Sequence, residues 1–103
     1  MRYLVLLVLV VAILACAQPS NEPPPEVKLT WDPVPDEEVT GYNVYRSEES
    51  GGGYARVNPS RLVEPEYTDT TVKRGRTYFY RVTAVSRTGV ESGFSVERSK
   101  AVD

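Results

Sequence analysis

The chain has 103 residues, of which 41% are apolar and 25% are charged, and this balance predicts one small globular domain. Its formal net charge of −2 provides no basic surface of the kind that neutralises phosphates, so we expect no nucleic-acid partner. The sequence contains no histidine and one cysteine, which excludes histidine acid–base catalysis, a Cys/His zinc site and an intrachain disulfide within it.

The first 15 residues have the pattern of an export signal. Arg2 is followed by an almost unbroken apolar run from Tyr3 to Ala15. A membrane-spanning helix needs about 20 apolar residues, whereas the apolar part of an export signal needs about 7–15. The run therefore predicts a signal peptide over residues 1–15 rather than a transmembrane helix.

The end of this run carries a motif of its own, Ile13-Leu14-Ala15-Cys16. An aliphatic residue and a small residue before the sole cysteine resemble the lipobox of bacterial lipoprotein precursors. The resemblance implies lipidation at Cys16 and an extracytoplasmic, membrane-anchored protein. Ala17, where an aspartate would favour the inner membrane, implies the outer membrane in a host that has two membranes. An ordinary signal cleaved near Ala15 or Ala17, with an incidental cysteine, is the alternative.

Residues 16–25 are polar and rich in proline, with no side chain large enough to anchor a core. Such a segment favours polyproline II, which extends by about 3.1 Å per residue. We expect a tether over residues 16–25 and a folded domain over residues 26–103.

The first half of the predicted domain contains short alternating runs. Val27, Leu29 and Trp31 alternate with polar residues, which predicts a half-buried strand. Further strands are expected over Thr40–Arg46, Tyr54–Val57 and Glu66–Thr70. No segment has helical periodicity.

The longest predicted strand covers Tyr78–Val85. One face of it carries Tyr78, Tyr80, Val82 and Ala84, which we expect in the core. The other face carries Phe79, Arg81, Thr83 and Val85, and tolerates water. A turn at Thr88-Gly89 should lead to a last strand over Phe94–Val102.

The segment before that strand resembles the tyrosine corner of Greek-key sandwiches. Val72 lies six positions and Gly75 three positions before Tyr78, whose phenol would hydrogen-bond back to upstream backbone. If Gly75 has positive φ, a larger residue there would be strained.

Taken in order, these motifs resemble the fibronectin type III family, in its bacterial branch. The matching stretches are Leu29-Thr30-Trp31, Gly41-Tyr42-Asn43-Val44-Tyr45-Arg46-Ser47, Tyr67-Thr68-Asp69, Gly75 with Tyr78-Phe79-Tyr80-Arg81-Val82-Thr83-Ala84-Val85, and Gly89-Val90-Glu91-Ser92 with Ser95. The resemblance implies an all-β, immunoglobulin-like Greek-key sandwich. The residues with an expected structural role are Trp31, Tyr42, Gly75 and Tyr78.

The sequence departs from the family pattern at its first strand. The family has a strand about ten residues ahead of Trp31, and this chain has the proline-rich span Pro19–Pro25 there. The first strand is therefore expected to be missing or degraded. Either the tether lies along the Val27–Asp32 strand, or that strand is a free edge to which a partner can add a strand.

One outward-facing row is a candidate binding face. Alternation places five residues on one surface of the sheet, namely Tyr45, Phe79, Arg81, Thr83 and Val85. Aromatic and arginine side chains concentrate binding energy in interfaces. Cross-strand pairing between Tyr45 and Phe79 explains the same residues without a ligand.

The acidic residues do not form a recognisable catalytic or metal site. Asp32, Asp36, Glu37 and Glu38 lack the spacing of a calcium loop, and a loop tip offers no cleft for a catalytic carboxylate pair.

We therefore expect a non-enzymatic, monomeric module without cofactor or metal, which contacts a protein or a glycan at the cell surface. A passive spacer or envelope assembly subunit is the alternative, and an enzyme the third.

Overall fold

The computed structural model describes residues 22–103, so the expected signal peptide, Cys16 and most of the tether lie outside the described residues. The described part forms six strands, which are β1 (Val27–Thr30), β2 (Val39–Ser47), β3 (Ala55–Arg56), β4 (Glu66–Asp69), β5 (Thr77–Ser86) and β6 (Arg98–Ala101). These strands lie where alternating apolar and β-branched residues predicted them, with one exception at the C-terminal end.

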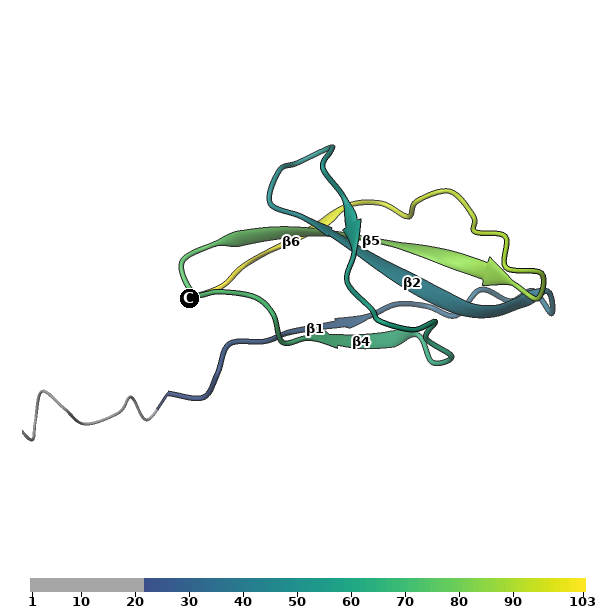
Figure 1. Cartoon of the computed structure of the whole chain (residues 1–103), viewed down its shortest axis with the longest axis horizontal. Helices are drawn as coiled ribbons and strands as arrows, with labels where there is room; N and C mark the ends of the chain where they lie inside the picture. The colour runs from purple at the N-terminus through teal and green to yellow at the C-terminus, as the bar shows by residue number, and fades with distance from the viewer. Residues whose placement is uncertain (1–21) are drawn as a thin grey trace, which may run out of the picture.

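The strands form two antiparallel sheets that pack face to face (Figure 1). One sheet has the order β1-β4, and the other has the order β3-β2-β5-β6. The chain thus changes sheet between β1 and β2, between β3 and β4, and between β4 and β5, as in a Greek-key sandwich. The all-β sandwich predicted from the sequence is confirmed.

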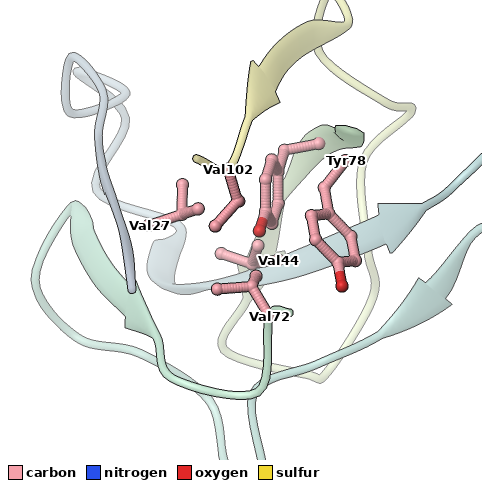
Figure 2. Packing of buried hydrophobic residues seen from close by; sticks show 6 residues of the cluster. Val27, Val44, Val72, Tyr78 and Val102 are labelled. Atoms are coloured by element: carbon pink, nitrogen blue, oxygen red, sulfur yellow. The ribbon is translucent and has the colours of Figure 1, made fainter. Parts of the chain in front are cut away.

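The core lies between the sheets and is drawn in Figure 2. Its buried members come from both layers, from the segment between β4 and β5 and from the C-terminal end, and are Val27, Val44, Val72, Tyr78, Tyr80 and Val102. Val82 and Ala84 share the inner face with these residues but are only half-buried. Trp31 is also half-buried, and it packs edge-on against Tyr42 with ring centroids 5.5 Å apart.

The corner before β5 has the geometry that its sequence motif implies. The Tyr78 hydroxyl accepts a hydrogen bond from the Lys73 N–H at 2.8 Å, and Tyr78 is 2% exposed. Gly75 lies between them with φ of 83°, a conformation that L side chains rarely adopt. The Gly75 N–H donates to the Val102 carbonyl, which ties the corner to the end of β6.

A buried polar cluster joins the two sheets across the core. Asp69 of β4 pairs with Arg46 of β2 at 2.9 Å and accepts a hydrogen bond from Tyr80 of β5 at 2.8 Å. The Thr71 hydroxyl donates to the same carboxylate. Burial alone raises the pKa of Asp69, but the hydrogen bonds from Thr71, Arg46 and Tyr80 outweigh it and hold the pKa below its ordinary value.

The predicted last strand over Phe94–Val102 is wrong in its first half. Regular pairing with β5 begins only at Arg98. Between Glu91 and Arg98 the chain follows β5 irregularly: Ser92 lies opposite Ala84, Ser95 opposite Val82 and Arg98 opposite Tyr80. Each step of three residues along this segment thus corresponds to a step of two residues along β5. This happens twice in succession, so the segment contains a pair of bulges. The hydroxyls of Ser92 and Ser95 accept the β5 N–H groups that a regular strand would bond through its carbonyls.

The described part of the tether does not lie along β1. The Arg74 guanidinium donates to the Pro23 carbonyl and lies 3.6 Å from the Glu22 carboxylate. Pro23, Pro24 and Pro25 line a shallow recess with the C-terminal residues 100–103. Residues 22–26 therefore pass the corner and leave the outer edge of β1 uncovered.

Candidate binding face

An aromatic cluster lies on the outer surface of the four-stranded sheet, the surface turned away from β1 and β4. Tyr45 of β2 and Arg81 of β5 are direct cross-strand partners. Tyr54 precedes β3, and Phe94 comes from the bulged segment. The Phe94 ring lies 5.1 Å from the Tyr45 ring and 5.6 Å from the Tyr54 ring. We call these four residues the aromatic face.

Arg81 is held between two of these rings. Its guanidinium carbon lies 5.3 Å from the centre of the Tyr54 ring and 5.7 Å from that of Phe94. Within residues 22–103, the buried Nε of Arg81 has no hydrogen-bond partner, so the guanidinium is positioned by the two rings rather than by an acceptor at this atom. Phe94 remains 48% exposed and is the most exposed member of the cluster.

Glu91 fixes one side of the aromatic face. Its carboxylate accepts hydrogen bonds from the Tyr45 hydroxyl at 2.6 Å, from Thr83 at 2.9 Å and from the Asn43 amide at 2.9 Å. The bond from Tyr45 is the largest of the effects that hold the pKa of Glu91 below its ordinary value. The same bond raises the pKa of the Tyr45 hydroxyl.

Glu97 fixes the other side. It accepts hydrogen bonds from the Tyr54 hydroxyl, from the Gly51 N–H at 2.8 Å and from the Ser50 hydroxyl at 2.8 Å. These contacts, that of Tyr54 first, lower the pKa of Glu97 to about 2. Glu97 thus joins the Ser50–Gly51 loop and Tyr54 to the bulged segment.

Two residues of the predicted binding face are not exposed, so that part of the prediction is wrong. Thr83 is 3% exposed and Val85 is 5% exposed. After the turn at Gly89 the chain returns to pair Glu91 with Val85, and the Glu91 side chain extends over Thr83. The row predicted by alternation is thus covered at one end.

The predicted pairing of Tyr45 with Phe79 is also wrong. Register places Phe79 opposite Ser47, and Tyr45 opposite Arg81. Phe79 is half-buried and makes none of the ring contacts of the aromatic face. Of the predicted row, Tyr45 and Arg81 belong to the aromatic face, and the covered Thr83 shares the Glu91 carboxylate with Tyr45.

Four residues that matter for this surface were missed by sequence reasoning, namely Tyr54, Glu91, Phe94 and Glu97. Phe94 was placed at the start of a regular strand, where it would have faced one side of a sheet edge. The available signal was a run of small residues: Ser92-Gly93 and Ser95 around a single aromatic residue are typical of a bulged edge.

The arrangement is suited to contact rather than to proton transfer. Both carboxylates have lowered pKa values, because each is committed to a tyrosine hydroxyl, so neither can serve as a proton donor near neutral pH. Residues 22–103 contain no group of three or more Cys, Asp or Glu side chains arranged to hold a metal ion. In the same range, no helix is long and apolar enough to cross a membrane.

Comparison with known proteins identifies the kind of domain. A sequence model described as the fibronectin type III domain matches residues 18–100. An Fn3-like protein from Clostridium thermocellum has 40% sequence identity and a TM-score of 0.64, over 72% of this chain and 73% of that one. A β-1,2-glucanase from Parabacteroides distasonis has 31% identity and a TM-score of 0.63, over 76% of this chain and 11% of the enzyme.

Curated relatives are much longer than this chain. The amylopullulanase of Thermoanaerobacter thermohydrosulfuricus is 42% identical over 72 residues, which cover 70% of this chain and 5% of the relative. The amylopullulanase of Thermoanaerobacterium thermosulfurigenes is 37% identical over 70 residues, which cover 68% of this chain and 4% of the relative. The similarity thus covers a small, non-catalytic domain type within these relatives.

Proposed function

The chain belongs to the fibronectin type III family, and we propose that it is a non-catalytic binding module, lipid-anchored at Cys16, that contacts a protein at the bacterial cell surface. The anchor is supported by the lipobox-like end of the apolar run. In a host with two membranes, Ala17 favours the outer membrane. The surface that makes the contact is the aromatic face.

The observation that carries the binding role is the exposed, braced Phe94. An aromatic residue that is 48% exposed and held in place by Tyr45, Tyr54 and Arg81 loses little conformational entropy when a partner covers it. Tyrosine and arginine are enriched among the residues that dominate interface energies. The ring packing would stabilise a passive spacer as well, but a spacer does not require the exposed part of Phe94.

A glycan is the second candidate partner, because relatives of the domain occur in an amylopullulanase and a β-1,2-glucanase. The ring geometry favours the protein partner. The Phe94 ring is inclined by 72° to Tyr45 and by 42° to Tyr54, so these rings form a raised cluster rather than a flat platform. A protein pocket can enclose such a cluster.

The proposal is tested by capture of envelope components with the full chain in detergent micelles. Replacement of Tyr45 and Phe94 by serine should reduce capture of a specific protein about tenfold, because the anchor side chains are removed. Val63→Ser is the matched control, since Val63 is 73% exposed but lies between β3 and β4. Equal capture by the native protein, the Tyr45/Phe94 variant and Val63→Ser would favour the passive spacer. If the Tyr45/Phe94 variant instead loses binding to an insoluble polysaccharide, the glycan is favoured.

A further inference from the structure

The side of the sandwich between β1 and β6 contains an open groove of about 580 Å³. Residues of both edge strands line it: 26–30 on one wall and 98–100 on the other, with Tyr80 between them. This groove lies between the edges of the two sheets, whereas the aromatic face lies on the outer surface of one sheet. The two surfaces can therefore be tested separately.

The β1 wall offers free backbone groups. The Trp31 N–H bonds to the Pro65 carbonyl, on the side of β4. Because backbone groups alternate in direction along a strand, those of Val27 and Leu29 point the same way, and those of Lys28 and Thr30 point to the other edge. Within residues 22–103, β1 pairs with β4 alone. The N–H and C=O groups of Lys28 and Thr30 are thus available to pair with a further strand.

The β6 wall carries two cations that face the groove. Arg98 is the cross-strand partner of Tyr80, and Lys100 that of Tyr78, so both lie on the inner face of their sheet with these buried tyrosines. Both cations are nevertheless exposed, although Pro23–Pro25 lie beside the backbone end of this wall at residues 100–103. No salt bridge to either is formed within residues 22–103.

We propose that the groove binds an extended acidic peptide segment of a partner protein, which adds to β1 as a third strand and directs carboxylates at alternate positions toward Arg98 and Lys100. Alternate residues of an extended chain are about 6.8 Å apart on either strand, so the spacing of the two cations matches an acidic residue at every second position. The added strand hydrogen-bonds to Lys28 and Thr30.

Charge decides among the possible occupants. Lys28, Arg98 and Lys100 outnumber Glu26 among the charged residues that line the groove. A second copy docked edge to edge would bring the same cations against each other, which is unfavourable. Residues 22–25 pass Arg74 and are not among the residues that line the groove, whose wall begins at Glu26. An acidic strand satisfies both the backbone edge and the two cations.

The test measures binding of a fluorescent peptide, acetyl-Ser-Glu-Thr-Glu-Thr-Glu-Ser-amide, to the full chain in detergent micelles. We expect saturable binding, together with slower hydrogen exchange at the Lys28 and Thr30 amides. Arg98→Ala/Lys100→Ala should weaken binding about tenfold, since two charge pairs are lost. The matched control is Arg56→Ala/Arg87→Ala, which removes two exposed cations elsewhere and should leave affinity unchanged.

Two further probes separate strand addition from simple charge attraction. The same peptide with lysine at the glutamate positions should not bind. A version with methylated backbone nitrogens on alternate residues keeps its charge but cannot complete a ladder, and it should bind at least tenfold more weakly.

Equal binding of the methylated peptide, or of Arg98→Ala/Lys100→Ala, would overturn the proposal. Tighter binding after deletion of residues 18–21 would also overturn it, because this chain's own segment would then be the occupant. Dimerisation that is abolished by Lys28→Pro would assign the groove to a second copy.

Discussion

The buried Tyr78 hydroxyl stabilises the corner before β5 by accepting a hydrogen bond from the Lys73 N–H. In Tyr78→Phe the Lys73 N–H loses its acceptor in the corner, and we expect a loss of about 1–2 kcal/mol in the free energy of unfolding. Urea denaturation measures this loss. Tyr45→Phe is the control, because its hydroxyl bond to Glu91 is exposed and its removal should cost less. Identical urea midpoints for Tyr78→Phe and the native protein would contradict a stabilising role of the hydrogen bond between the Lys73 N–H and the Tyr78 hydroxyl.

Asp69 is a buried carboxylate that links strands of both sheets. Asp69→Asn removes the counter-charge of Arg46 and weakens the acceptor for Tyr80, so we expect a loss of about 2–3 kcal/mol at pH 7. Glu66→Gln on the same strand is exposed and should change stability by less than about 0.5 kcal/mol. Equal unfolding midpoints for the two variants would contradict the role of Asp69.

Residue burial was predictable only where the local pattern decides it. The burial of Tyr78 and Tyr80 follows from alternation along one strand, and the corner from a fixed spacing between Gly75 and Tyr78. The burial of Thr83 depends on Glu91, which reaches it from beyond a turn. The alternation within β5 does not depend on Glu91, so it predicted that Thr83 lies on the outward-facing surface.

At the scale of elements, the strands were predictable and the bulges were not. The alternating residues of β2 and β5 predict both strands within one or two residues, because one face of each must be buried. The segment between Glu91 and Arg98 instead follows side-chain hydroxyl bonds from Ser92 and Ser95. Since those bonds depend on a neighbouring strand, a reading of local pattern could not place Phe94 beside Tyr45 and Tyr54.

The bulged segment should detach from the aromatic face in acid. Glu97 has its folded pKa lowered to about 2, so its contribution is fully present above its ordinary pKa of about 4.5 and is lost as the pH falls toward 2. We expect the Phe94 ring resonances to shift toward free-chain values over this range. Glu97→Gln is the control: it has no carboxyl group at position 97, so its Phe94 ring resonances should show no transition over this range. Unchanged native resonances from pH 7 to pH 2 would contradict this role of Glu97.

At the scale of the whole molecule, the anchor determines where the binding face operates. Lipidation at Cys16 predicts that the native protein stays with membranes after a high-salt wash, and that its N-terminal peptide carries the mass of a diacylglycerol group. Cys16→Ser should be released or remain as an unmodified precursor. A native mature chain that begins at Ala17 or later, without an acyl mass, would contradict the anchor.

The most direct test of the binding role is photo-crosslinking in living cells that produce the full chain. A photoreactive benzoylphenylalanine at position 94 replaces an exposed ring in the aromatic face, and the same group at position 63 serves as the control, because Val63 is 73% exposed elsewhere. We expect a discrete protein adduct at position 94 and none at position 63. No adduct at position 94, or the same adducts at both positions, would contradict it.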